Sequence, residues 1–269
     1  MQKIVAVLNH LEHAERILGR AVKAAERYDA SLELLFVHEA PLFTLPDLLL
    51  LPGEERETTI DREKIKDTLA GSVKALGYDR PCAIFVFVDD TADRVAAHTA
   101  GERDVLVIAG YHPSLSREIA KICYPPLLIL KTERETAARI SLPVELDGTA
   151  ESCIAMARSH FPEAEIRLIC DNHYLADREE NKRRREAFEK LRRESALEGS
   201  YIEEFAWNEA DFGEDFEAIE EHLLAAIERD GSDLLLLCSK NGDFLYSEGL
   251  TLSLLHRTAT DLLLYRHIR

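Results

Sequence analysis

Short apolar runs alternate with longer amphipathic stretches along the whole chain, and this pattern occurs twice. Five runs fall within residues 3–131 and five more within 139–266. Each run is bounded by polar or turn-forming residues and is too short for a helix, so we predict buried β-strands. The predicted strands are Lys3–Leu8, Leu32–His38, Cys82–Val88, Asp104–Ala109 and Pro126–Lys131, then Arg139–Val144, Ala164–Cys170, Tyr201–Trp207, Asp233–Cys238 and Asp261–Arg266.

The stretches between the runs carry apolar residues three and four positions apart, as amphipathic helices do. After the first strand these residues are Ile17, Leu18, Ala21, Val22 and Ala25, and after its counterpart they are Cys153, Ile154, Ala157 and Phe161. Strands that alternate with helices predict right-handed crossovers and a parallel sheet covered on both faces. The fold class is therefore α/β.

The repeat divides the chain between Lys131 and Arg139, and we predict domains at residues 1–133 and 138–269. A chain of 269 residues is long enough for two domains that each bury a core. The segment between them is polar, short and poor in glycine, which is typical of a connector that lets the halves pack together.

The net charge of −17 is concentrated in the second half. Residues 203–221 hold nine acidic side chains and no Lys or Arg, so the field disfavours binding to nucleic acids. A solvated acidic helix is the favoured interpretation, with a docking surface for a basic partner as the alternative. The basic run Lys182–Arg185 has glutamates at salt-bridge spacing around it, as in a self-paired surface helix.

No segment approaches the roughly 20 apolar residues of a membrane span. The first predicted strand begins at Lys3 with no leader before it, so we expect a cytoplasmic protein. The five cysteines have no spacing typical of zinc or redox motifs. We expect buried, reduced thiols.

The segment Pro41–Pro52 is unusually apolar for a loop and contains three prolines. Three prolines exclude a regular central strand, and so apolar a loop is not expected to face water. It is predicted to cover a domain or dimer interface, or to form the wall of a pocket for a small apolar ligand.

Several segments resemble a universal stress protein domain. In the first half they are Lys3–Leu8 leading into a helix, Leu35–Pro41 closing the second strand, and the helix and fourth strand within Ala92–Ile108; in the second half they are Leu142–Glu145 and Leu234–Ser239. The resemblance covers nearly the whole chain. It implies two tandem Rossmann-like domains, each a five-stranded parallel sheet in the order 3-2-1-4-5 with helices on both faces. It also implies a role in the stress response, frequent ATP binding, and pairing of domains through their fifth strands.

The nucleotide site of the resembling family uses an aspartate after the first strand and a glycine-rich loop after the fourth. Here Asn9 and Glu145 stand at the aspartate position, and the first-half loop keeps only Gly110 and contains Pro113. The second-half loop has glycines at another spacing. We therefore predict degenerate nucleotide sites. The cofactor-binding candidates that the resemblance implies are Asn9, His38, Val88, Gly110, Glu145, Trp207, Ser239 and Gly242.

Other chemistry has little support in the sequence. His10 and His13 flank Glu12, but exposed histidines at a helix end are favoured over a metal cluster. There is no nucleophile elbow, no Walker loop and no carboxylate pair with acid–base spacing. Asp89–Asp90 is expected to start the next helix. We expect no catalytic residue and no metal site.

These observations favour a non-catalytic stress-response protein that binds a ligand or partner. One alternative is an adenine-nucleotide sensor that uses Glu145, Ser239 and Gly242 of the second domain. The other, a weak nucleotide hydrolase, lacks a base or metal-ligand constellation. The expected partners are a small apolar ligand or a nucleotide, with ATP as the only cofactor candidate, together with intramolecular domain pairing and a homodimer.

Overall fold

The computed structural model describes residues 1–12, 14–39, 60–102, 104–134, 136–144, 150–173, 178–197, 201–205, 215–240, 243–244 and 248–267. The chain forms two compact units, Met1–Pro125 and Pro126–Arg269. The apolar segment Pro41–Pro52 lies outside the described residues.

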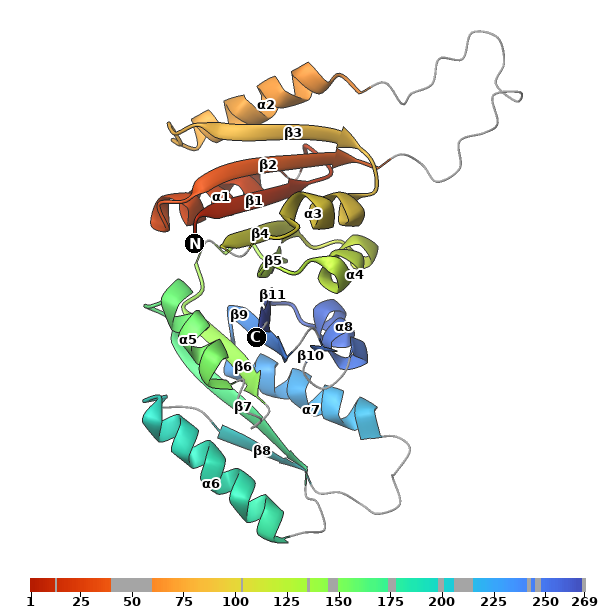
Figure 1. Ribbon diagram of the computed structural model, residues 1–269. Helices are drawn as coiled ribbons and strands as arrows, with labels where there is room; N and C mark the ends of the chain where they lie inside the picture. Colours follow the sequence, from red (N-terminus) through yellow and green to blue (C-terminus); the bar gives the residue numbers. More distant parts are fainter. Residues whose placement is uncertain are drawn as a thin grey trace, which may run out of the picture. The chain divides into compact units, whose positions relative to one another are not determined.

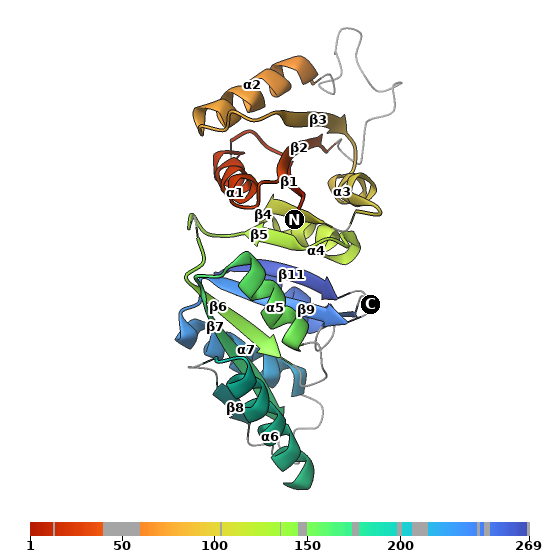
Figure 2. The same cartoon turned by 60° about the vertical axis from the view of Figure 1, so that its left-hand side comes forward.

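The first unit is a parallel sheet with helices on both faces. Its strands are β1 (Lys3–Leu8), β2 (Ser31–His38), β3 (Cys82–Val88) and β4 (Val105–Gly110), and its helices are α1 (Ala14–Arg27), α2 (Arg62–Ala75), α3 (Thr91–Thr99) and α4 (Pro113–Ile122). The strand order is β3-β2-β1-β4. Helices α1 and α2 lie on one face, and α3 and α4 on the other (Figure 2).

Local sequence explains where these elements begin and which side they bury. The apolar stripe predicted for α1 is its buried side, and β1 is buried from Ile4 to Leu8. Helix α3 begins after Asp90, whose carboxylate accepts a hydrogen bond from the backbone N–H of Asp93 at 2.8 Å. Such a cap satisfies a free N–H of the first helical turn. The expectation that Asp89–Asp90 starts a helix is confirmed.

The second unit continues the same alternation (Figure 1). Its strands are β5 (Leu127–Leu130), β6 (Arg139–Val144), β7 (Glu165–His173), β8 (Tyr201–Phe205), β9 (Leu234–Lys240), β10 (Asp243–Phe244) and β11 (Asp261–His267), and its helices are α5 (Ala150–His160), α6 (Arg178–Glu194), α7 (Asp215–Asp230) and α8 (Glu248–Arg257). The order is β5-β11-β9-β6-β7-β8. All these neighbours are parallel except β5, which pairs antiparallel with β11.

Strand β10 was not predicted, and its place follows from the pairing of β9. Strand β11 occupies one edge of β9 from Leu234 to Lys240. On the other edge, β6 pairs with β9 only through Ile140↔Leu234 and Ser141↔Leu235. Strand β10 pairs antiparallel with the far end of β9. Because a strand has two edges, β10 takes the edge that β6 has left, beside the carboxyl end of β6.

The structure confirms the α/β class and a mostly parallel sheet with helices. The division between the compact units falls before β5, whereas the predicted domain boundary follows it. Among the described residues, no helix is long and apolar enough to cross a membrane.

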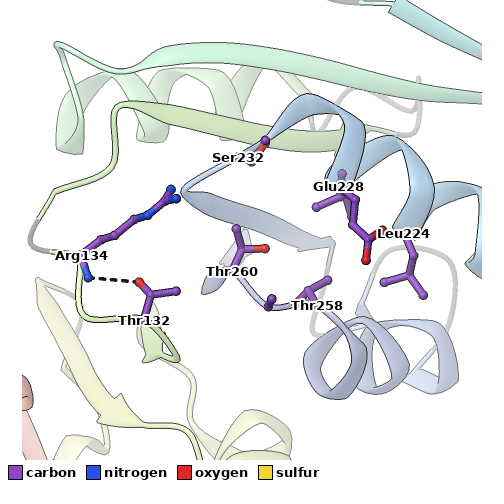
Figure 3. Close-up of a pocket in the computed structure, with 10 residues that line it drawn as sticks. Thr132, Arg134, Leu224, Glu228, Ser232, Thr258 and Thr260 are labelled. Atoms are coloured by element: carbon purple, nitrogen blue, oxygen red, sulfur yellow. Dashed lines mark hydrogen bonds between the residues drawn. The ribbon is translucent and has the colours of Figure 1, made fainter.

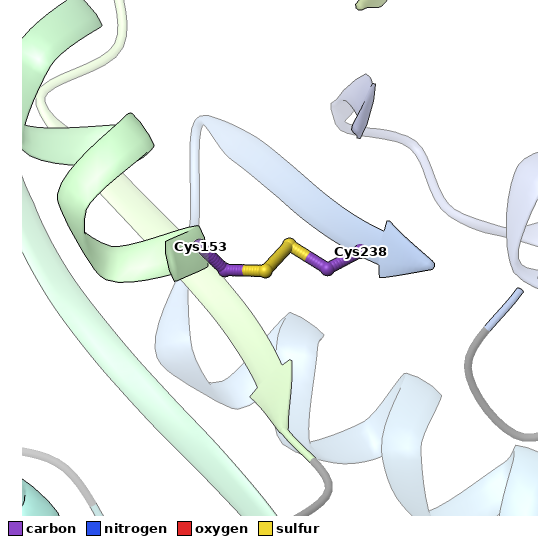
Figure 4. The surroundings of a disulfide bond; sticks show 2 residues. All are labelled: Cys153 and Cys238. Carbon is purple, nitrogen blue, oxygen red and sulfur yellow. A yellow bond between two sulfur atoms is a disulfide. The ribbon is translucent and has the colours of Figure 1, made fainter. Parts of the chain in front are cut away.

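The expectation that all cysteines are reduced is wrong for one pair. Cys153 on α5 and Cys238 on β9 form a disulfide (Figure 4). Helix α5 packs on β9 and brings their Cα atoms to 6.4 Å, within the range that a disulfide spans. A sequence separation of 85 residues left no local spacing signal. Cys82, Cys123 and Cys170 are free thiols.

Candidate functional site

The first unit brings four predicted site residues to one edge of its sheet. Val88, His38 and Gly110 end the strands β3, β2 and β4, and Asn9 directly follows β1. Val88 and His38 are register partners. Since all four strands are parallel, these residues follow the carboxyl edge in the order of the strands. This is the edge at which open α/β sheets bind ligands.

Gly110 lies close beneath helix α1. A Cβ atom added at Gly110 would stand 3.1 Å from Ile17 Cδ1 and 3.6 Å from Arg16 Nη2. The absence of a side chain at this position lets the first turn of α1 approach the end of β4. The guanidinium of Arg16 is therefore the cation nearest to this strand end among the atoms around Gly110.

The connection from β4 to α4 is very short. Strand β4 ends at Gly110 and α4 begins at Pro113, so only Tyr111 and His112 join them. The backbone N–H of His112 donates to the buried Ser116 Oγ at 2.9 Å, and Pro113 has no N–H. Two of the amides at this helix start therefore offer no donor to a ligand.

An ion pair occupies the next strand end. Arg94 pairs with the carboxylate of Asp89, and its guanidinium carbon lies 4.4 Å from the centre of the Phe87 ring. The hydrogen bond from Arg94 holds the pKa of the Asp89 carboxyl below its ordinary value, helped by the backbone N–H of Asp90. This arrangement orders the start of α3 and leaves neither charge free for an obvious acid–base role.

In the second unit, Ser239 lies inside the sheet. Its backbone pairs with Arg266 of β11 and with Phe244 of β10. The stretch after β9 therefore turns back as a β-hairpin, where the resembling family has its phosphate loop. Glu145, Trp207 and Gly242 lie outside the described residues, so the structure does not place them.

A buried charge network at the opposite, amino edge of this sheet was not predicted. Asp230, which is 4% exposed, accepts hydrogen bonds from Arg167 Nη1 at 2.6 Å and from Ser141 Oγ at 2.8 Å. Arg167 Nε also donates to Glu165 at 2.9 Å, and this bond lowers the pKa of the Glu165 carboxyl. The signal in the sequence was an arginine and a serine within otherwise apolar strands.

A cavity of about 240 Å³ also lies at the amino edge (Figure 3). It is lined by Thr132, Arg134, Leu224, Ile227, Glu228, Gly231, Ser232, Thr258, Ala259 and Thr260. Several of its polar groups have partners within the protein: Arg134 pairs with Asp233, Ser232 Oγ donates to Asp230, and Thr258 Oγ1 donates to the Leu254 carbonyl. This pattern is typical of a structural cavity.

Beside it, Asp261 fixes the start of the interdomain segment. This carboxylate, 2% exposed, accepts hydrogen bonds from the backbone N–H groups of Lys131 and Thr132, both at 2.8 Å. Lys131 Nζ donates to the Thr258 carbonyl at 2.6 Å. Burial lowers the pKa of Lys131 to about 8, against the opposing effect of the Asp261 charge.

Within the described ranges, no three His, Cys, Asp or Glu side chains are grouped so that they could hold a metal ion.

Comparison with known proteins identifies the fold. No family model and no curated protein matches the sequence. Among solved structures, a candidate universal stress protein from Pseudomonas aeruginosa UCBPP-PA14 has a TM-score of 0.66 at 16% identity, covering 99% of this chain and 93% of that one. A protein of unknown function from Pseudomonas aeruginosa PAO1 has a TM-score of 0.66 at 17% identity, with coverages of 99% and 92%.

A universal stress protein from Archaeoglobus fulgidus DSM 4304 is similar to the same extent. Its TM-score is 0.66 at 13% identity, with 98% of this chain and 96% of that chain covered. At such identities the likeness shows the fold alone. The chain has the α/β fold of these proteins, and the match extends over both halves.

Proposed function

We propose that this protein is a non-catalytic member of the universal stress proteins that acts by binding a ligand or partner, with degenerate nucleotide sites in both halves. One observation carries the proposal: neither half has a phosphate loop after its fourth strand. The first half has only Tyr111 and His112 between β4 and α4. The second half has the β9–β10 hairpin.

The geometry of the hairpin weakens the alternative of an adenine-nucleotide sensor in the second half. In open α/β sheets the ligand enters the crevice beside the first strand, where the strand order reverses. In this sheet that place lies between the carboxyl ends of β6 and β9. Strand β10 pairs with β9 on this side, so the crevice is filled by the chain's own backbone.

The tandem organisation belongs to the same proposal. The second repeat has the strand order β8-β7-β6-β9-β11, which corresponds to 3-2-1-4-5, and β3-β2-β1-β4 repeats its first four positions. The fifth strands of the two repeats, β5 and β11, pair through Leu127↔Leu264, Leu128↔Leu263 and Ile129↔Leu262. This ladder supports intramolecular pairing of the repeats. A cytoplasmic location and a homodimer are further parts of the proposal.

The decisive experiment is a calorimetric titration of the full chain with ATP and magnesium. We expect no saturable binding tighter than about 10 μM, which corresponds to roughly −7 kcal/mol. Tighter binding would contradict the degenerate-site proposal. In that case, Asn9→Glu and Ser239→Glu would assign the site to one half, because each places a carboxylate where the phosphates would lie. Native mass spectrometry of the same sample would report a retained small molecule and the oligomeric state.

A further inference from the structure

The disulfide joins two elements that differ in sequence position and in type. Cys153 lies in the first turn of α5, and Cys238 lies near the carboxyl end of β9 (Figure 4). Both side chains are 1% exposed. The bond therefore fastens the start of a surface helix to a central strand, inside the core of the second unit.

The first half places a different pair of residues at the equivalent positions. Ile4 pairs with Leu106 and Ile140 with Leu234, so Gly110 and Cys238 each lie four residues after matching partners. Ile17 and Cys153 are each the fourth residue of their helix. Gly110 and Ile17 are in close contact across the first half. The disulfide thus replaces a van der Waals contact between helix and strand.

The backbone around the disulfide gives it a larger mechanical role than the contact has in the first half. Strand β1 pairs with β4 from Lys3 to Val7, whereas β6 pairs with β9 only at Ile140 and Ser141. Pro143 has no N–H with which to extend that ladder. Helix α5 follows β6 in the chain, so its start is held to β9 by side-chain packing and by the disulfide.

We propose that Cys153 and Cys238 form a reversible thiol–disulfide pair whose redox state sets how firmly α5 is held against β9. Disulfides are rare in reducing compartments, and those found there are mostly transient or redox-sensing. The step from a permanent to a reversible bond rests on the cytoplasmic location proposed above. The glutathione experiment below measures reversibility directly and does not depend on nucleotide binding or on a stress role.

The reaction partner is a low-molecular-weight disulfide such as oxidised glutathione. One cysteine thiolate attacks it, forming a mixed disulfide and releasing one glutathione thiolate, which takes up the proton that the cysteine lost. The second cysteine thiolate then attacks the protein-bound sulfur and releases the second glutathione. In total, two protein thiols become one disulfide and one glutathione disulfide becomes two glutathiones. Reduction is the reverse. Because both sulfurs are buried, either direction requires α5 to open from β9.

The test equilibrates the full chain in glutathione buffers from fully reduced to fully oxidised. Acid quenching, alkylation of free thiols and peptide mass spectrometry then give the state of each cysteine. We expect Cys153 and Cys238 to change together, while Cys82, Cys123 and Cys170 remain thiols. Hydrogen exchange on the two forms should show α5 amides exchanging about tenfold faster or more after reduction, with α1 amides unchanged.

The first half supplies a matched control. The variant Cys153→Ile with Cys238→Gly copies the residue pair of the first half, so it should fold and show no redox dependence of α5 exchange. A pair that stays oxidised in every glutathione buffer would overturn reversibility, and a pair that stays reduced would overturn the disulfide. A redox change that leaves α5 exchange unaltered would overturn the fastening role. The wild-type comparison needs no variant, so it stands even if the control folds poorly.

Discussion

Glu33 and Arg167 occupy equivalent positions in the two halves but carry opposite charges. Glu33 pairs in register with Val5, the third residue of β1, and Arg167 pairs with Ser141, the third residue of β6. Each is neutralised by neighbours of its own half. Glu33 contacts His98 Nε2 at 2.8 Å and Lys3 Nζ at 3.3 Å, whereas Arg167 binds Asp230. The repeats have kept a buried charge at this position while exchanging its sign.

Replacing Arg167 should destabilise the protein because it leaves Asp230 buried without its cation. Breaking a buried ion pair in this way costs about 3–5 kcal/mol, and we expect Arg167→Ala to lie near the lower end since Ser141 still donates to Asp230. Urea unfolding measures the change. Lys190→Ala is the control, because its pair with Glu194 is exposed and should contribute less than about 0.5 kcal/mol. Equal effects of the two variants would contradict this assignment.

Lys131 should make the stability depend on pH under alkaline conditions. Burial lowers its pKa from 10.5 to about 8 in the folded chain. Above that pH the folded chain releases the proton while the unfolded chain keeps it, so the free energy of unfolding gains a contribution that rises with pH. Below pH 8 both states are protonated and the contribution is constant.

The measurement for Lys131 is the free energy of unfolding of the wild type minus that of Lys131→Met, between about pH 7 and 9.5. The difference should be level at first and then change in favour of the wild type. Other titrating groups cancel in it. A difference that falls as the pH rises would show that the folded chain holds this proton more tightly than the unfolded chain.

Two glycines of the first unit should respond oppositely to alanine. Gly110→Ala inserts a methyl group 3.1 Å from the buried Ile17 and should destabilise by about 1 kcal/mol through overpacking. Gly71 lies inside α2 with nothing within 4 Å of an added Cβ, so Gly71→Ala should stabilise by about 0.5–1 kcal/mol. Thermal unfolding resolves both. A stabilising Gly110→Ala would mean that α1 is not tightly packed there.

Removal of the disulfide should lower the stability of the second unit. In the chain-entropy account, a closed loop of 85 residues contributes about 4–5 kcal/mol. Urea unfolding with and without reductant should show this loss in the wild type. Cys170→Ser keeps the disulfide and should show the same dependence on reductant, while Cys153→Ser should show none. A reductant effect that persists in Cys153→Ser would have to arise from another cysteine.

The strands were predictable because their apolar runs are short and sharply bounded. Arg139–Val144 and Cys82–Val88 were predicted with the bounds that the structure has. Strand β7 continues to His173, beyond the predicted end, because the polar residues Asp171–His173 pair with β8. Composition alone does not mark such residues as a strand, since their pairing depends on a partner distant in the sequence.

The candidate site was predictable only as far as topology determines it. Parallel strands place Asn9, His38, Val88 and Gly110 at one edge, and this follows from the strand pattern. The position of Arg16 over Gly110 and the pairing of β10 with β9 are tertiary contacts. A two-residue strand has no hydrophobic period, so nothing in the sequence indicated that the chain would fill the crevice itself.

The ladder between β5 and β11 has a consequence for how the protein is made. Strand β5 belongs by sequence to the first repeat, but its partner Leu262–Leu264 is close to the end of the chain. During synthesis β5 leaves the ribosome long before β11 exists. Its apolar edge then has no partner, and such an edge readily pairs with other chains. The sheet can be completed only when translation is nearly finished, so a ribosome that stalls late in the second repeat would release a chain prone to aggregation.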